Sequence, residues 1–399
     1  MRLVTDAERR RRLAVRHGLH PDHRAAGPLE ATRAMTVLHA TEPSTVHLSV
    51  QARTEGVSID DVEHALYRER SIVKQLAMRR TMFVAPRDLL PALWGSASAR
   101  VAVAEYKRLA KEIESAGIAD DGPAHLERAF AAVEAHLADG SAHQAAKLRE
   151  ALVELSGMVD RAVGKSYASR GSIAPNVLTL MGVQGRIVRG ENAGGWRVSR
   201  PRWTSMQTWL GEVPAAWDSQ AGYAEIVRRW LATFAPGTEA DLVWWLGGTK
   251  AAVRQALADV GAVQVALGSG EVAWVLPDDV DERPGETAEA VGPWASLLPV
   301  LDPTTMGWRG RDWYLPREHV PYLFDTVGNG CTTVWVDGRI VGGWVQDEAG
   351  RVEVVLLEKV TADQRRLIDA QAARLTEWLE GQVVSNVYSS HVMKRLPLP

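Results

Sequence analysis

The sequence places a histidine and a threonine two residues apart, immediately before an acidic residue and a proline. His39 and Thr41 precede Glu42-Pro43 in the segment MTVLHATEPSTVHL. A neutral imidazole can accept a proton from water near pH 7, and a hydroxyl group can orient the same water. This pair is therefore a candidate for holding a hydrolytic water molecule.

The pair can cooperate only if the chain leaves the helical conformation there. Residues two apart on an ideal helix point about 200° away from each other. Pro43 disfavours the helical region for Glu42, so we expect the preceding turn to open and both side chains to share one side. An alternative stays open, in which His39 complements a helix dipole and Thr41 makes a local turn bond.

The first third of the chain predicts helices followed by a strand, the order of a winged helix. We expect helices at 8–20, at 27–40, at 58–70 with Ser58 as the N-cap, and at 71–80, then a strand at 81–86.

Residues 223–276 give a clearer pattern of the same kind. Helices are predicted at 223–235, at 238–246 with a stop at Gly247-Gly248, and from the cap Thr249 onwards, before a hairpin around a Gly-Ser-Gly turn. Helix, short turn, helix and hairpin is the order of a helix-turn-helix with its wing. The middle of the chain repeats this plan and ends in a hairpin at 186–202.

The tail differs from the rest. Residues 332–358 predict three short strands with a type I′ turn at Asp337-Gly338, and a capped helix follows at 361–381. The predicted fold class is α+β, mostly helical, with tandem winged-helix units and a small C-terminal β-rich domain. We place unit 1 with the candidate motif at 1–120, unit 2 with the hairpin at 121–215, unit 3 at 216–290 and the C-terminal domain at 291–399.

Composition restricts the class of protein. The 399 residues are 46% apolar and contain no apolar run near 18 residues, which argues against a membrane span. Cys331 is the single cysteine, so a disulfide framework and a cysteine-based zinc cluster are excluded. The spacing of the 11 His predicts no metal site, and no phosphate-binding glycine motif predicts a nucleotide, so we expect no cofactor. The N-terminus lacks a signal-like apolar core, and we expect a cytoplasmic protein.

Basic residues are the candidates for binding a polyanion. The net charge is −3, but most of the 46 basic residues are Arg, whose guanidinium group can bind two phosphate oxygens at once. A GC-rich genome is the alternative explanation for the excess of Arg. The hairpin at 186–202 sets five arginines against Glu191, which is typical of a confined DNA-binding surface. We name as candidate DNA contacts, with a merely solvated face as the alternative, Arg79, Arg80, Arg186, Arg189, Arg197, Arg200, Arg202, Lys250 and Arg254.

Several long segments resemble one family over nearly the whole chain. They are LSVQAR with VEHALYRERSIVKQLAMRRTMFV, then WWLGGTK, LLPVLDPTTMGWRGR and FDTVGNGCTTVWVDGRIVGGW. With these segments the chain resembles the AlkZ/YcaQ family of bacterial winged-helix DNA glycosylases. The resemblance implies hydrolysis of the N-glycosidic bond of N7-alkylated purines, in some members for unhooking crosslinks or protecting antibiotic producers. The family's catalytic Gln–apolar–Gln or Gln–apolar–Asp element corresponds here to His39-Ala40-Thr41.

The resemblance leads to two functional hypotheses. In the first, a monofunctional, metal-free glycosylase acts on bulky N7-alkylguanine adducts in double-stranded DNA, as a nucleoid-associated monomer. His39 and Thr41 hold the water, and Asp302 either stabilises the sugar cation or forms a turn before Pro303. In the second, the chain binds DNA without catalysis, as a regulator or as a protein that sequesters lesions.

Overall fold

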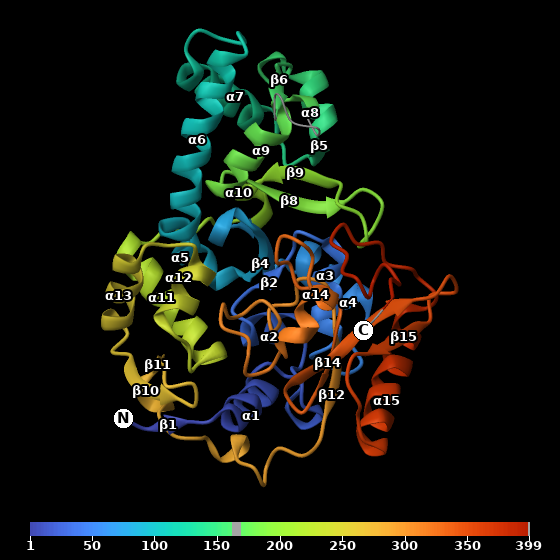
Figure 1. Cartoon of the computed structure of the whole chain (residues 1–399). Coiled ribbons are helices and arrows are strands. Elements are labelled where there is room, and N and C mark those ends of the chain that lie inside the picture. Colours follow the sequence, from blue (N-terminus) through green and yellow to red (C-terminus); the bar gives the residue numbers. More distant parts are fainter. Residues whose placement is uncertain (162–168, 398–399) are drawn as a thin grey trace.

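The computed structural model describes residues 1–161 and 169–397. It is a mixed α+β structure of many helices with small sheets, as the sequence predicted, and most of its helices lie in the N-terminal three quarters (Figure 1). Three successive groups of helices each carry a small sheet, and a four-stranded sheet with its own helix follows.

The first unit alternates helices and strands in the order of a winged helix. Its sheet has the order β2-β4-β3, and the turn between β3 and β4 at residues 77–81 is the wing. The elements are α2 (Pro28–Ala34), β2 (Leu38–His39), α3 (Pro43–Gln51), α4 (Ile59–Glu63) with a π-helical turn over His64–Arg68, β3 (Ile72–Leu76) and β4 (Met82–Pro86). The predicted Ser58 cap is confirmed, since its side chain accepts from the Asp61 N–H.

Two helix predictions in this unit are wrong. The helix expected over 27–40 ends at Ala34, because Thr36 takes a positive φ of 64° and the next residues pair with β4. The segment 71–80, expected as a helix, contains strand β3. Its β-branched residues Ile72 and Val73 fit a half-buried pleated surface, and pairing with β4 outweighs the amphipathic helical pattern.

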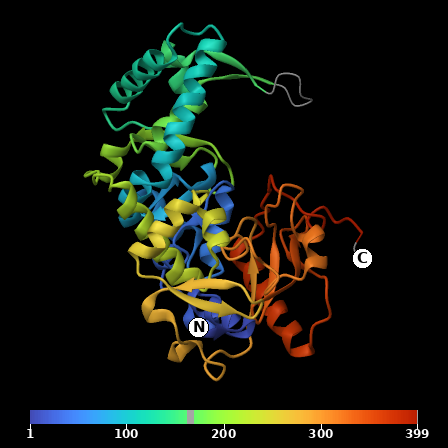
Figure 2. The ribbon, with the colours of Figure 1, turned by 60° about the vertical axis from the view of Figure 1, so that its left-hand side comes forward.

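The second unit stands above the first in Figure 1. Its sheet has the order β5-β9-β8, and the predicted hairpin is formed by β8 and β9. A two-stranded arm, β6 with β7, is inserted between α8 and α9 and extends sideways from the upper part of the molecule (Figure 2). Within the range predicted for unit 1, two helices lead to the second unit, α5 (Leu90–Gly95) and α6 (Ala97–Ser115). The elements of the second unit are α7 (Gly122–His136), β5 (His143–Gln144), α8 (Ala145–Ala151), β6 (Met158–Arg161), β7 (Ser169–Ser172), α9 (Ala174–Val183), β8 (Ile187–Asn192), β9 (Pro201–Ser205) and α10 (Met206–Leu210).

The third unit forms as predicted. Gly247 ends its second helix in the left-handed conformation, and Thr249 caps the third. The elements are α11 (Ser219–Phe234), α12 (Glu239–Leu246), α13 (Lys250–Asp259), β10 (Val263–Leu267) and β11 (Val272–Val275). From the chain's start, β1 (Leu3–Val4) adds to β10 in parallel, and α1 (Asp6–Arg16) packs against α11. The division into four domains stays a prediction.

The C-terminal part is a sheet covered by one helix. The three predicted strands are confirmed, and a fourth joins them in the order β12-β13-β14-β15. Asp337 and Gly338 have φ of 49° and 80°, which fits the predicted type I′ turn. The elements are β12 (Ala295–Leu298), α14 (Val320–Leu323), β13 (Thr333–Val336), β14 (Arg339–Gln346), β15 (Val352–Leu356) and α15 (Ala362–Leu379).

The tip of the β8–β9 hairpin is anchored in the C-terminal part. Trp196 is 7% exposed, and its ring lies 5.9 Å from Trp378 and 5.1 Å from His47. Its Nε1–H donates to Gln382 Oε1 at 3.0 Å. The hairpin of unit 2 therefore joins the upper part of the molecule to the C-terminal part.

We expect Trp196→Ala to lower the free energy of unfolding by about 3–5 kcal/mol, because a large buried ring leaves a cavity. Trp196→Phe keeps most of the packing but loses the hydrogen bond, which costs about 1 kcal/mol. Chemical denaturation measures both. The matched control is Trp217→Ala, at a side chain that is 42% exposed; an equal loss in this control contradicts the anchoring role of Trp196.

Candidate functional site

The candidate motif lies on an extended segment at the edge of the first unit's sheet. His39 pairs with Phe83 of β4, and the Ala40 N–H continues the pairing by donating to Met82 O at 2.9 Å. Alternate residues of an extended chain point to the same side. The open backbone that the pair requires is therefore present, but a strand supplies it instead of the end of a helix.

His39 is enclosed, whereas Thr41 is open to solvent. The imidazole is 3% exposed, and its centroid lies 4.7 Å from that of Phe83. Nδ1 is sealed from solvent without a hydrogen-bond partner. Nε2 has no partner among the described residues either.

Burial keeps the His39 imidazole neutral. Loss of hydration lowers its pKa to about 3, and the positive charge of Arg79 acts in the same direction. The ring is thus a hydrogen-bonding group and a weak base at neutral pH.

The residue after Thr41 ties the motif to the C-terminal tail. Glu42 is 6% exposed, and its Oε1 accepts the Val387 N–H at 2.7 Å. Pro43 then opens α3 as its first residue, where its missing N–H removes no helical bond. Tyr388, next in the tail, packs with Val300 and Cys331.

The wing turn of unit 1 places Arg79 beside the motif. Arg79 and Arg80 both have positive φ, 53° and 58°, which is uncommon for residues with a Cβ. The Arg79 guanidinium lies over the Trp244 ring at 4.2 Å, and that of Arg311 lies over the same ring at 5.3 Å. Arg311 also lies 4.8 Å from the ring of Phe324.

Phe324 forms a bridge with Gly330 that closes a short loop containing Asp325. Burial raises the pKa of Tyr388, and the charges of Glu42 and Asp325 act in the same direction. The tail continues from Tyr388 through Val387 to Glu42. The sequence did not single out Trp244, Arg311 or Val387 as site residues. Trp244, in WWLGGTK, and Arg311, in GWRGR, lay in stretches that carried the resemblance, whereas Val387 did not.

The other candidate DNA contacts outside the hairpin differ in whether they already form an ion pair within the chain. Arg80 forms a bidentate pair with Glu105, at 2.7 and 3.0 Å. Arg254 does the same with Glu239, at 2.7 and 3.1 Å. Lys250, at the start of α13, is exposed.

The five hairpin arginines do not form one open surface. Arg189 packs over Trp203, and burial lowers its pKa to about 10. Arg197 donates to Val383 O at 2.5 Å, so it helps to anchor the tip. Arg186 pairs with Glu134 at 3.2 Å, and Arg202 lies 3.9 Å from Glu191. Arg200 is exposed.

Asp302 is a structural residue. It is 0% exposed, and both its oxygens accept from Arg53, at 2.7 and 2.8 Å. Oδ2 also accepts from the Ser49 hydroxyl at 2.7 Å, and Oδ1 accepts the Thr304 N–H at 2.9 Å, a local turn bond. Of the two roles expected for Asp302, the turn is the one present. The role in stabilising a sugar cation stays a prediction, and the enclosed carboxylate paired with Arg53 gives it no support.

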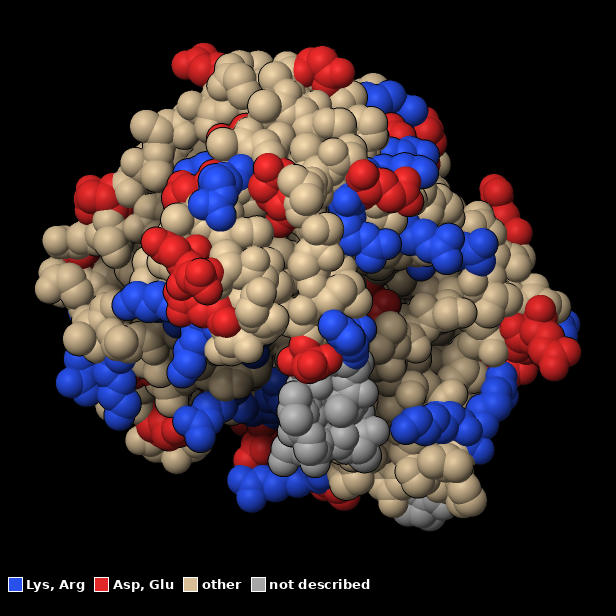
Figure 3. All heavy atoms as spheres, turned by 90° about the horizontal axis from the view of Figure 1, so that it is seen from above, with Lys and Arg blue, Asp and Glu red and all other residues tan. Residues whose placement is uncertain are grey.

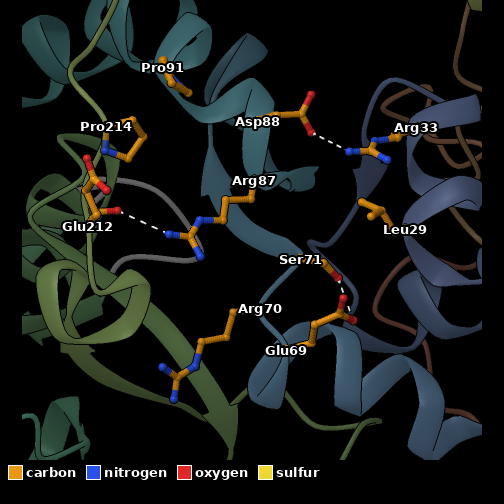
Figure 4. A pocket seen from close by; sticks show the side chains of 10 residues that line it. All are labelled: Leu29, Arg33, Glu69, Arg70, Ser71, Arg87, Asp88, Pro91, Glu212 and Pro214. Atoms are coloured by element: carbon orange, nitrogen blue, oxygen red, sulfur yellow. Dashed lines mark hydrogen bonds and ion pairs between the residues drawn. The ribbon is translucent and has the colours of Figure 1, made fainter.

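The described part of the chain has a pocket that lies apart from the candidate motif. A pocket of ≈ 600 Å³ lies among α2, the end of β4, α5 and the segment before α11, and is lined by an ion pair between Arg33 and Asp88 (Figure 4). It contains neither His39 nor Thr41.

Viewed from above, the molecule is hollowed between its two main masses, and Lys and Arg lie on both edges of that hollow (Figure 3).

Within residues 1–161 and 169–397, no group of three or more His, Cys, Asp or Glu side chains is arranged to hold a metal ion. Over the same residues, no helix has the length and apolar character needed to cross a bilayer.

One comparison with known proteins identifies the family, and a second shows the fold. The model of a family described as "DNA glycosylase AlkZ-like" matches residues 32–378. Among solved structures, the DNA glycosylase AlkZ of Streptomyces sahachiroi matches with a TM-score of 0.73 and 18% identity, over 100% of both chains. A sequence comparison with curated proteins found no match.

We expect the NMR signals of the His39 ring to stay constant from pH 8 to pH 5, since its pKa lies near 3. The unfolded histidine takes up a proton below pH ~6.5, and the folded one does not until about pH 3. The stability contributed by the neutral ring is therefore present above pH ~6.5 and lost as the pH falls, by up to ~1.4 kcal/mol per pH unit. His39→Gln assigns the signals and removes this slope. A ring that titrates near pH 6.5 in the folded protein contradicts the prediction.

Proposed function

The chain belongs to the AlkZ-like DNA glycosylase family, and on this premise we propose that it hydrolyses the N-glycosidic bond of bulky N7-alkylguanine adducts in double-stranded DNA. The observation that carries the proposal is the neutral, unpartnered imidazole of His39 on an extended segment, two residues before an exposed hydroxyl.

The chemistry of this substrate suits such a site. An N7-alkylated guanine is already cationic, so it departs without protonation by an acid. The enzyme then has to orient a water at C1′ and stabilise an oxocarbenium-like transition state. Attack on that cation makes the water strongly acidic, so even a weak base can accept its proton late in the step.

His39 and Thr41 divide this task in the proposed mechanism. Nε2 of His39 accepts a hydrogen bond from the water and then its proton. The Thr41 hydroxyl fixes the direction of the oxygen lone pair. The Gln residues of the family's element offer the same kind of acceptor, an amide oxygen, without a formal charge.

The placement of Lys74 supports a hydrolytic mechanism over one with an amine nucleophile. Lys74 is a buried amine in the same sheet, with its pKa lowered to about 8 by burial. It aligns with Val84 and Leu38 across the strands, whereas His39 aligns with Phe83. The two sets face opposite sides of the sheet, so this amine points away from the motif. We therefore propose a monofunctional glycosylase.

An exposed apolar side chain beside the motif supports a bulky adduct. Val387 is 83% exposed, and its backbone N–H is bonded to Glu42. An apolar group next to a polar site provides contact area for the aromatic part of a natural-product lesion. Protection of an antibiotic producer from its own product is the biological role that we infer.

The basic edges of the hollow in Figure 3 support double-stranded DNA as the partner. We propose that the protein acts on it as a monomer, because three winged-helix units already lie on one chain.

A second function is favoured by one observation. His39 is nearly enclosed and is a very weak base, and both family glutamines are replaced. A protein that binds the lesion and shields it without cleavage is consistent with these facts. The two functions differ in whether a free modified base appears.

For the glycosylase, we expect His39→Ala to slow single-turnover release of the modified base by about 10²- to 10⁴-fold, the usual contribution of a positioned proton acceptor. Thr41→Val removes one hydrogen bond to the water and slows release by about fivefold to tenfold. His39→Gln restores a neutral acceptor and retains more activity than His39→Ala. Chromatography of the released base from adducted duplex measures each rate.

The control is His64→Ala, at an exposed ring on the π-helical turn of unit 1. Its rate is expected to match that of the wild type. Absence of base release by the wild type from any N7 adduct, with unchanged protection of cells by His39→Ala, favours sequestration instead.

We also expect Val387→Ser to reduce release of a bulky aromatic adduct while leaving release of 7-methylguanine unchanged, because only the bulky group reaches the apolar edge. The same rate assay on two duplexes measures the ratio. Val153→Ser, at another side chain that is 77% exposed, is the matched control. Equal losses on both substrates contradict a role for Val387 in selecting the adduct.

A further inference from the structure

Several buried guanidinium groups in this chain have a carboxylate partner. Arg12 lies 2.7 Å from Glu8, and Arg16 lies 2.7 Å from Asp279. Arg53 forms its bidentate pair with Asp302. This is expected, because an unpaired charge taken out of water is costly.

Arg79 and Arg311 do not follow this pattern. In the described part of the chain, neither forms an ion pair with a carboxylate, and the same holds for Arg189, which bonds only to the Thr179 hydroxyl. The Nε atoms of Arg79 and Arg311 are sealed from solvent and make no hydrogen bond. Burial lowers the pKa of Arg79 to about 10, and the nearby charge of Arg311 lowers it further. Two like charges are thus held close together without a counter-charge.

The geometry holds the two cations in a fixed arrangement. Both lie over the Trp244 ring, at 4.2 and 5.3 Å from its centroid. The end of α12 packs tightly on the wing turn: a Cβ at Gly247 would come within 2.8 Å of the Arg79 side chain. Arg100 completes this end by donating to Leu246 O at 3.4 Å.

The backbone of the wing supports a functional interpretation. Two consecutive residues with a Cβ, Arg79 and Arg80, adopt left-handed conformations that cost free energy. This backbone directs Arg79 towards Trp244, while Arg80 turns to Glu105. A strained turn that brings one arginine to an uncompensated position is better explained by a ligand than by packing.

We propose that Arg79 and Arg311, set on Trp244, form a binding site for one phosphodiester of the DNA backbone next to the nucleotide that is hydrolysed. The proposal rests on the function proposed above. The phosphate supplies the missing counter-charge, and two planar guanidinium groups bind its oxygens in a fork. Because Arg79 lies close enough to His39 to act on its charge, the phosphate would fix the register of the strand relative to the motif.

The test is the salt dependence of binding to an undamaged DNA duplex. Each phosphate neutralised by a protein contributes about 0.9 to the slope of log K against log salt concentration. We expect Arg79→Gln with Arg311→Gln together to reduce the slope by ~0.9, since both hold one phosphate. Each single variant is expected to give a part of this loss.

Two further variants keep the test decisive if the glutamine variants fold poorly. Arg79→Lys and Arg311→Lys keep the charge and lose the fork, so weaker binding with an unchanged slope is expected. The matched control is Arg366→Gln on α15, an exposed arginine paired with Asp363, which is expected to change nothing.

An unchanged slope in the folded double variant overturns the proposal, and so does a loss of ~1.8, which indicates two separate phosphates. Undamaged duplex separates this question from catalysis. A reduced slope in the double variant, without base release by the wild type, refutes the glycosylase and leaves the phosphate site standing. Base release by the wild type, with an unchanged slope in the double variant, refutes the phosphate site and leaves the glycosylase standing.

Discussion

The pairing of buried positive charge is the constraint on which the architecture depends. The bidentate contact of Arg53, just after α3, with Asp302 joins the end of this helix to the segment between β12 and α14, and both side chains are 0% exposed. Thr304 extends this network to His17 of the N-terminal part. Removing one partner of such a pair leaves a charge without water or counter-charge, which costs far more than a surface ion pair contributes. The helix that follows the motif is thereby fixed relative to the rest of the chain.

The two cations beside the motif, Arg79 and Arg311, lack a counter-charge of this kind in the described part of the chain. The chain balances the charge of Arg12, Arg16 and Arg53 within its own core, whereas Arg79 and Arg311 form no ion pair among the described residues. Arg79 and Arg311 are stabilised by the face of Trp244, which weakens the repulsion but does not neutralise it. The uncompensated cations and the neutral imidazole lie together, which is the arrangement expected where DNA brings negative charge to an apolar reaction site.

The sequence predicted the parts whose signals are local. The third unit has strong caps and stops, such as Thr249 and Gly247, and its helices and hairpin formed as expected. The prediction of a helix over 27–40 was wrong, because the periodicity of Leu29, Met35 and Leu38 cannot reveal a strand partner, β4, more than 40 residues later in the chain. The site shows the same limit. His39 and Thr41 were named from spacing and resemblance, whereas Trp244, Arg311 and Val387 reach the motif only through tertiary contacts.

The unpartnered Nδ1 of His39 connects the structure to the proposed chemistry. For Nε2 to accept the proton of a water, the neutral ring must carry its own proton on Nδ1. In this protein that N–H is buried and finds no acceptor, and such a loss costs about 1–3 kcal/mol. A carboxylate at Nδ1 would remove the cost and raise the basicity of the ring, yet it would also attract a second proton and make the ring a cation beside Arg79. The unpartnered site keeps His39 a neutral acceptor, which is the property it shares with the glutamine that it replaces.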